Sequence, residues 1–252
     1  MGLRTVIQER YRLQGVSRSF GPLEVLHDLS LEILHGEFVA IVGPSGCGKT
    51  TLLNLLSGFD KPTSGTVVRR GEVRMIYQQD GLLPWQTVAQ NVALGLRHVK
   101  SGATRTRQVR ELLRLIRLEA FEHHYPHQLS GGMRQLVELA RALAGDSDIL
   151  LMDEPFSSLD YLTRLRMREE LARILAERPR TVVLVTHDIE EAAQLADRVI
   201  VLSECPGQIR YQLNIPAPRP RNPTQPDVVR AMHLILTKLN IEHDAGEYAD
   251  AR

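Results

Sequence analysis

The sequence predicts an α/β fold in which a parallel sheet carries a small antiparallel β subdomain and an inserted helical subdomain. Three observations support this prediction. In the last third of the chain, short apolar runs alternate with helical stretches, which is typical of a parallel sheet. In the first third, apolar and polar residues alternate loosely, as they do in antiparallel strands. Between these parts, residues 87–144 have apolar positions at helical spacing.

The first third contains the start of the sheet. Residues 38–42 are an unbroken apolar run, which predicts a buried strand, and a helical run begins at residue 50. Residues 23–34 and 65–78 alternate apolar and polar positions. We therefore expect those two segments to form antiparallel strands around the first core strand.

The middle third is expected to be a helical insertion over residues 84–147. Two sets of apolar residues within it fall on one face of a helix, which predicts amphipathic helices. These sets are Val109, Leu112, Leu113 and Ile116, followed by Leu136, Val137, Ala140 and Leu143.

The last third is expected to complete the parallel sheet, because buried-strand runs alternate with helical stretches. The strand runs are residues 149–152, 182–185 and 199–202, and the helical stretches are residues 161–177 and 189–196.

A change of composition marks the C-terminal part. Residues 216–226 hold five prolines and two arginines, which predicts an extended connector, and a short amphipathic helix follows at residues 227–239. We therefore expect one domain over residues 1–215 and a Pro/Arg-rich tail with a short helix over residues 216–252.

Composition limits the class of protein. The 252-residue chain is 43% apolar, enough for a large core, and its net charge of +1 favours no nucleic acid partner. Its longest apolar runs are about a quarter of the ~20 residues that a membrane-spanning helix needs. The N-terminus has no apolar signal core, so export is not expected. Two cysteines, Cys47 and Cys205, suit the reducing cytosol.

Residues 43–50 fit the pattern G-x-x-x-x-G-K-[ST] between the predicted strand and helix. Glycines allow backbone N–H groups to curl around phosphate oxygens, and the helix N-terminus adds its positive dipole end. Lys49 is expected to reach the β- and γ-phosphates, and Thr50 to offer its hydroxyl to Mg²⁺. The pattern predicts a P-loop NTPase core that binds a nucleoside triphosphate through Gly43, Pro44, Ser45, Gly46, Cys47, Gly48, Lys49, Thr50 and Thr51.

Two carboxylates, Asp153 and Glu154, follow the apolar run at residues 149–152. Ligands of open α/β folds bind at the carboxyl edge of the sheet, where such residues lie. Asp153 is expected to face the Mg²⁺ held by Thr50, while Glu154 orients and deprotonates the attacking water. Taken alone, an Asp-Glu pair is more often a solvated turn, but the phosphate loop upstream favours the catalytic interpretation.

A second glycine-rich element, residues 129–135 (L-S-G-G-M-R-Q), opens one of the predicted helices. Ser130 is at the N-cap position, and Gly131 and Gly132 leave backbone N–H groups open to an anion. We expect this element to bind phosphate as well.

Residues 43–50, 129–135 and 153–154, in this order, resemble the nucleotide-binding subunit of ATP-binding cassette (ABC) transporters. The L-S-G-G element is the most specific part, because many phosphate-loop ATPases lack it. The resemblance covers residues 11–209 and implies a RecA-like core that binds ATP and Mg²⁺. It also implies four roles: stacking on adenine for Phe20, sensing of Mg²⁺ and contact with the membrane subunit for Gln78, crossing of the dimer interface for Asp160, and contact with the γ-phosphate for His187.

Several of these assignments have alternatives. Phe20 could be core packing, and a register shift would move the role of Gln78 to Gln79. His187 could be a structural or surface histidine. The three histidines at positions 123, 124 and 127 suggest a metal site by spacing, but the family has a similar Tyr-Pro-His-Gln stretch just before its signature, which is the L-S-G-G element at residues 129–132 here.

The resemblance implies a head-to-tail dimer, either a homodimer or a pair with a paralogous cassette, in which the signature of one subunit caps the ATP of the other. Movement would pass to separate membrane permease subunits through residues 78–85, although Trp85 is equally interpretable as buried core. A combination of features looks like the cassettes of nitrate, sulfonate and taurine importers: Leu82-Leu83-Pro84-Trp85, Asn91-Val92, the short loop at residues 203–209 and the Pro/Arg-rich tail.

Such an importer would place the chain at the cytoplasmic face of the inner membrane and act indirectly with an extracytoplasmic solute-binding protein. Two alternatives remain open at this point. One is the ATPase subunit of an exporter, which would use the same chemistry with a different permease. The other is a soluble ATP-driven regulator or DNA-repair cassette that never meets a membrane.

Overall fold

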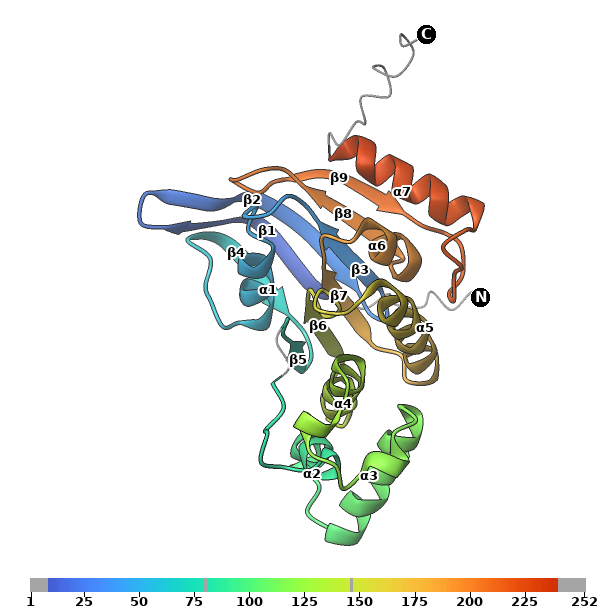
Figure 1. Cartoon of the computed structure of the whole chain (residues 1–252). Coiled ribbons are helices and arrows are strands. Elements are labelled where there is room, and N and C mark those ends of the chain that lie inside the picture. The colour runs from blue at the N-terminus through green and yellow to red at the C-terminus, as the bar shows by residue number, and fades with distance from the viewer. Residues whose placement is uncertain (1–8, 79–80, 146, 240–252) are drawn as a thin grey trace, which may run out of the picture.

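The computed structural model describes residues 9–78, 81–145 and 147–239, and it contains two sheets and a group of helices (Figure 1). The larger sheet has six strands in the order β5-β6-β7-β3-β8-β9. All neighbours in it are parallel except β8 and β9. Its strands are β3 (Phe38–Val42), β5 (Val73–Ile76), β6 (Ile149–Asp153), β7 (Thr181–Val185), β8 (Arg198–Leu202) and β9 (Ile209–Asn214).

The smaller sheet is antiparallel and has the order β2-β1-β4, with β1 at Glu9–Phe20, β2 at Leu23–Leu34 and β4 at Ser64–Arg69. The antiparallel prediction for residues 65–78 is therefore right for β4 and wrong for β5, which pairs in parallel with β6. The physical reason is that β5 is an edge strand of the parallel sheet. Its partly exposed residues alternate as antiparallel strands do.

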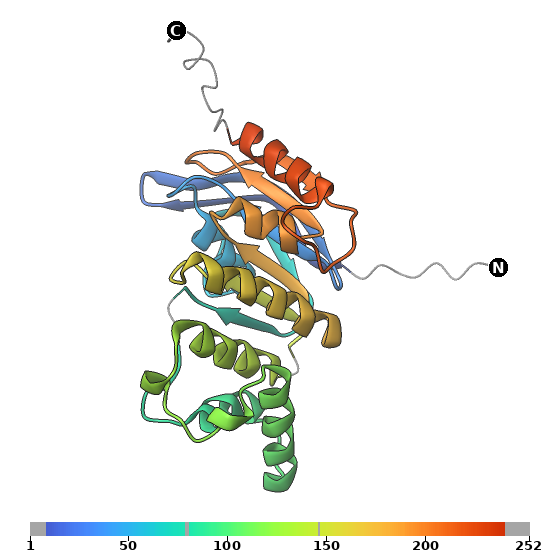
Figure 2. The ribbon, with the colours of Figure 1, turned by 45° about the vertical axis from the view of Figure 1, so that its right-hand side comes forward.

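The central strand β3 divides the core between the two faces of the sheet. Val39 and Ile41 pack with the antiparallel sheet and with α1 (Lys49–Ser57) in one cluster of buried residues. Phe38, Ala40 and Val42 belong to the other cluster. That second cluster contains residues of α5 (Tyr161–Glu177), α6 (Ile189–Leu195) and α7 (Pro226–Lys238), which lie across the front of the sheet in Figure 2.

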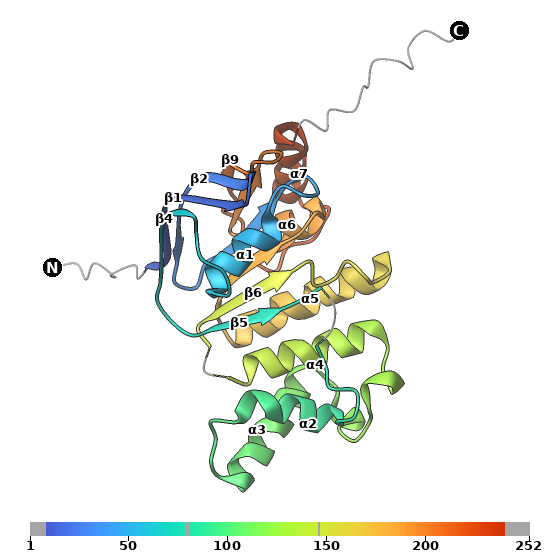
Figure 3. The same ribbon diagram turned by 90° about the vertical axis from the view of Figure 1, so that its left-hand side faces the viewer.

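The helical insertion forms a separate layer next to β5 and below the sheet in Figure 3. Its α-helices begin at side-chain caps: Thr87 forms a capping box, and Ser101 and Ser130 accept bonds from backbone N–H groups. Among the helices of the described ranges, none is both long and apolar enough to cross a membrane. The insertion consists of α2 (Val88–Ala93), η1 (Leu94–Leu96), α3 (Gly102–Leu115), η2 (Glu119–Phe121), η3 (Pro126–Gln128) and α4 (Gly131–Leu143).

The C-terminal segment is fixed to the core by one buried arginine. The Arg221 side chain is 1% exposed, and it donates hydrogen bonds to carbonyl oxygens of two segments, the end of α6 and the residues that follow β9. Its acceptors include Ala193 and Ala196 at the end of α6 and Ile215 and Ala217 after β9. Burial lowers the pKa of this guanidinium. The expected helix is present as α7, and it packs against α6 and β9.

Candidate nucleotide site

The phosphate loop, residues 43–50, connects the C-terminal end of β3 with α1. Gly46 and Gly48 have φ angles of 78° and 95°, in the left-handed region that favours glycine. Gly48 also lies so close to β2 that a Cβ atom would be 2.6 Å from Leu26 Cδ2. Glycine at position 48 is therefore required both by its backbone angle and by the neighbouring strand.

A depression of ≈ 290 Å³ lies over this loop. Residues of three separate segments line it, which brings β2, the phosphate loop and the end of β6 to one place. The lining consists of Val25, Ser45, Gly46, Gly48, Lys49, Thr50, Thr51 and Glu154.

Lys49 lies along the phosphate loop. Its Nζ atom donates hydrogen bonds of 2.9 Å to the carbonyl oxygens of Gly43 and of Pro44. The side chain of Cys47 is fully buried, and burial raises the pKa of its thiol. A neutral, buried thiol is a poor nucleophile, so Cys47 contributes packing rather than chemistry.

Asp153, the last residue of β6, is 8% exposed and lies beside Thr50. Burial raises the pKa of its carboxyl, and a hydrogen bond from the Thr50 hydroxyl acts in the opposite direction. The structure thus brings together two of the three residues expected at Mg²⁺, Thr50 and Asp153, from two elements far apart in the chain. A carboxylate and a hydroxyl at the edge of a phosphate loop are oxygen ligands of the kind that Mg²⁺ takes, so these residues fit the ion.

Glu154 and His187 meet across the carboxyl edge of the sheet. The Oε2 atom of Glu154 is 3.0 Å from Nδ1 of His187, and their side chains are 22% and 56% exposed. Glu154 has a φ angle of 45°, a conformation that is uncommon for residues other than glycine. Its N–H donates to the carbonyl oxygen of Val185 at 2.8 Å, which attaches this turn to the end of β7.

Gln78, two residues after the end of β5, contacts the segment that follows Glu154. Its Nε2 atom donates to Oγ of Ser157 at 3.2 Å, and that hydroxyl donates to the carbonyl oxygen of Glu154 at 3.0 Å. The alternative residue for its role, Gln79, lies outside the described residues.

The second glycine-rich element, residues 129–135, lies at the start of α4 and outside the depression over the phosphate loop. The Ser130 hydroxyl accepts from the N–H of Met133 as the N-cap of α4. Gly131 lies against Leu159, just before α5, and Gly132 lies against Thr163 in the first turn of α5. Asp160 caps α5, and hydrogen bonds from Thr163 lower the pKa of its carboxyl. In the described part of the chain, none of these four residues lines the depression over the phosphate loop.

Phe20, at the end of β1, is 48% exposed, so the core-packing alternative for this ring is wrong. The guanidinium carbon of Arg18 lies 4.3 Å from the centre of the ring. Asp60 holds that guanidinium by an ion pair of 2.9 Å. Phe20 therefore has one face covered by Arg18, while Val25, five residues later in the same hairpin, lines the depression.

Sequence reasoning missed the turn between β8 and β9, which packs behind the phosphate loop. A Cβ atom on Gly207 would be 2.2 Å from the carbonyl oxygen of Cys47, and the N–H of Gly207 donates to Val25. The available signal was weak: a glycine that follows the predicted strand at residues 199–202. The core interpretation of Trp85 is also wrong, because this residue is 70% exposed.

Comparison with known proteins places these features in a family. Residues 26–157 match the family model described as "ABC transporter", and residues 122–193 match a model described as "AAA domain, putative AbiEii toxin, Type IV TA system". The chain is 47% identical to the aliphatic sulfonates import ATP-binding protein SsuB 1 of Rhodococcus jostii (strain RHA1), over 83% of this chain and 85% of that protein.

Two similar solved structures are described as the dimeric structure of MJ0796, a bacterial ABC transporter cassette, and its dimeric post-hydrolysis state bound to ADP and Pi. Each has a TM-score of 0.70 and 34% identity, and the alignment covers 82% of this chain and 99% of that one.

Proposed function

The chain belongs to the ABC transporter family and is an ATP-binding ATPase subunit; from this premise, we propose that it powers the import of small sulfonate-type anions through separate membrane subunits. The observation that carries the proposed ATP hydrolysis is the position of Glu154, which lines the depression over the phosphate loop and contacts His187. The importer assignment is supported by the name of the Rhodococcus relative, a sulfonate import protein.

In this proposal the phosphate loop, with Lys49 and Thr51, holds the phosphates of ATP, and Thr50, Asp153 and Gln78 hold Mg²⁺. Bound Mg²⁺ neutralises phosphate charge and leaves the γ-phosphoryl group open to attack by water. Glu154 is the general base: its carboxylate orients that water and accepts its proton. His187 contacts the γ-phosphate and, through Nδ1, holds the Glu154 carboxylate in place.

The position of the signature residues supports action as a dimer. Since Ser130, Gly131, Gly132 and Asp160 lie away from the depression of their own chain, we propose that they complete the site of a second subunit. The similar solved structures are described as dimeric. Phe20 would stack on adenine through the ring face that Arg18 leaves uncovered.

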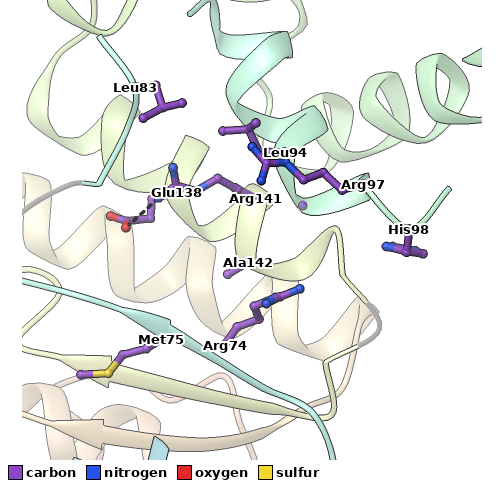
Figure 4. Close-up of a pocket in the computed structure, with 10 residues that line it drawn as sticks. Arg74, Met75, Leu83, Leu94, Arg97, His98, Glu138, Arg141 and Ala142 are labelled. Atoms are coloured by element: carbon purple, nitrogen blue, oxygen red, sulfur yellow. Dashed lines mark hydrogen bonds and ion pairs between the residues drawn. The ribbon is translucent and has the colours of Figure 1, made fainter. Parts of the chain in front are cut away.

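A second cavity, of ≈ 470 Å³, is the proposed docking site for the membrane subunit (Figure 4). It lies between β5 and the helical insertion. Met75, Leu83 and Leu94 give it an apolar part, and Arg74 and Arg97 give it a cationic part. Trp85 is exposed and lies two residues after Leu83 in the chain. A cytoplasmic segment of a permease bound in this cavity would therefore have an aromatic side chain nearby to contact. Under this proposal the chain acts at the cytoplasmic face of the membrane, and a solute-binding protein acts on the other side.

The test of the proposed chemistry is the variant Glu154→Gln in the full chain. It should bind ATP with wild-type affinity, lose at least about 100-fold in turnover, and shift to a dimer on a sizing column when ATP is added. Normal hydrolysis by this variant would remove Glu154 from the role of general base.

The transport role has its own test. Deletion of the gene should abolish growth on an alkanesulfonate as the only sulfur source, and wild-type but not Glu154→Gln should restore it. Affinity purification from gently solubilised membranes should recover a multi-spanning permease. Recovery without any membrane partner would contradict the transporter assignment, and recovery with a permease that only exports would contradict import.

A further inference from the structure

A buried carboxyl group lies behind the turn that carries His187. Glu191, on α6, is 2% exposed, and its Oε2 atom accepts a hydrogen bond of 2.5 Å from the hydroxyl of Thr186. The same hydroxyl accepts a bond of 2.9 Å from the N–H of Asp188. The Thr186 hydroxyl therefore bonds to Glu191 and to the backbone of Asp188, and Thr186 and Asp188 are the two residues that flank His187.

The backbone of residue 191 closes this arrangement. Its N–H donates to Oδ1 of Asp188 at 3.1 Å, as part of the N-cap of α6. The N–H of Thr186 donates to the carbonyl oxygen of Ile41 on β3, so the turn is also attached to the strand that leads into the phosphate loop. Residues 186–188 are thus held by β3 on one side and by Glu191 on the other. His187, in contrast, is more than half exposed and contacts Glu154 through Nδ1.

The burial of Glu191 is costly, which argues that its carboxyl has a function beyond packing. Its Oε1 atom has no hydrogen-bond partner among the described residues. Burial raises the pKa of Glu191 to about 7. The charged groups that face it are Arg168 and Arg164 from α5 and Asp188 from the turn before α6. An apolar residue of similar size would avoid this desolvation cost.

We propose that Glu191 is a positioning residue for ATP hydrolysis: through the Thr186 hydroxyl, its carboxyl fixes the turn at residues 186–188 and so holds His187 against Glu154. The inference rests on the roles proposed above for Glu154 and His187. Glu191 is given no contact with nucleotide, because the hydrogen bond of its carboxyl goes to Thr186.

The test compares steady-state ATPase kinetics of the full chain with four substitutions. Glu191→Leu and Thr186→Val each remove one partner of the hydrogen bond, and both should lower kcat about tenfold, since small misplacements of catalytic groups are costly. The KM for ATP should change less than about twofold, because the phosphate loop is untouched. Glu191→Gln keeps an acceptor for the hydroxyl and should restore kcat to within about twofold of wild type.

Glu190→Leu is the matched control. Glu190 is the neighbouring acid and pairs with Arg168 at 2.9 Å, but it makes no contact with Thr186 in the described interactions. This variant should lose stability without losing kcat per folded molecule. The double variant Thr186→Val with Glu191→Leu should be no slower than Thr186→Val alone, because Thr186→Val already removes the bond to Glu191 together with the bond from the Asp188 N–H.

Three results would overturn the proposal: Thr186→Val with wild-type kcat, additive effects in the double variant, or a Glu191→Gln variant as slow as Glu191→Leu. Thr186→Val keeps the side-chain volume, so it remains informative even where Glu191→Leu does not fold. Loss of turnover in Glu154→Gln tests the proposed base separately, so the failure of one idea is distinguishable from the failure of the other.

Discussion

The two glycine-rich segments contain the same residue for different physical reasons. In the phosphate loop, Gly46 and Gly48 adopt left-handed backbone angles, and Gly48 also lies against β2. In the signature, Gly131 and Gly132 belong to α4, a right-handed helix, and lie close to α5. A Cβ atom on Gly132 would be 3.0 Å from Cγ2 of Thr163.

This difference shows what each segment does within one chain. The phosphate loop uses glycine to form a concave surface, and it lines a depression. The signature uses glycine to allow close packing, and its two glycines lie against Leu159 and Thr163, on either side of the start of α5. A glycine-rich pattern thus indicates a close approach of backbone, but the fold decides whether the neighbour is a ligand, another helix or a second subunit.

The largest effect is expected at Gly48. Gly48→Ala places a side chain at a φ angle of 95° and 2.6 Å from Leu26, so both strain and overlap oppose it. We expect ATP affinity to fall about 100-fold and the free energy of unfolding to drop by about 2–4 kcal/mol. Isothermal titration and urea denaturation measure the two effects. Gly36→Ala, with a φ angle of 76° and open space around its Cβ, is the control for strain alone.

The second effect separates binding from turnover. Ser130→Arg fills the surface that we propose to cap the partner subunit's nucleotide, so hydrolysis should fall about 50-fold or more. ATP affinity of the monomer should stay within about twofold of wild type, because Ser130 does not line the depression of its own chain. Nucleotide binding below the dimerisation concentration is the measurement. Lost binding by the monomer would show that the signature serves its own chain.

A smaller effect concerns the pH dependence of stability. The contributions of Asp153 and Asp160 to the free energy of unfolding should change in opposite directions with pH, because the pKa of one carboxyl is raised and that of the other is lowered. Burial raises the pKa of Asp153 above its ordinary 3.8, so this group's contribution to stability is present at low pH and is lost as pH rises through the raised value. Thr163 lowers the pKa of Asp160, so its contribution is present above 3.8 and is lost as pH falls through the lowered value.

The measurement is urea denaturation of wild type, Asp153→Asn and Asp160→Asn between pH 7 and pH 3. On acidification, the difference between wild type and Asp153→Asn should move in favour of wild type. The difference between wild type and Asp160→Asn should move in favour of the variant. Differences with the same sign would mean that the two environments are not opposed as described.

The smallest effect is expected at Gly132. Alanine gains about 1 kcal/mol of helix propensity over glycine, but the close contact with Thr163 offsets this gain. Gly132→Ala should therefore stay within about 1 kcal/mol of the wild-type free energy of unfolding. A loss above about 3 kcal/mol would show that the α4–α5 contact is as strict as the phosphate loop. The comparison of two kinds of glycine would then fail.

Strong patterns in the sequence predict much of this fold. The apolar run at residues 149–152 appears as β6, and the helical stretch at residues 161–177 has the bounds of α5. Both are long enough or apolar enough for local periodicity to identify them. β1 and β9 were not identified as strands, because their half-exposed residues mix polar and apolar types and only pairing with a neighbour makes them strands.

The candidate site divides in the same way. Local motifs identify Lys49, Thr50 and Asp153, which the structure then brings together. No local pattern predicts that Gly207 packs behind the phosphate loop, because this contact depends on tertiary packing. The bond between Thr186 and Glu191 joins residues only five apart, but no motif used in the sequence analysis includes Glu191. Sequence reasoning finds residues that belong to one motif, and it misses residues that come into contact only in the folded structure.

The order of strands in the larger sheet has a consequence for synthesis on the ribosome. β3 emerges early, but in the folded protein it lies between β7 and β8, which emerge after the helical insertion. A nascent chain therefore carries its phosphate loop long before the two strands that hold it in place exist, and such long-range pairing is slow to form. We expect the growing chain to bind nucleotide only once β8 has left the exit tunnel, so translation itself delays the first encounter of this ATPase with ATP.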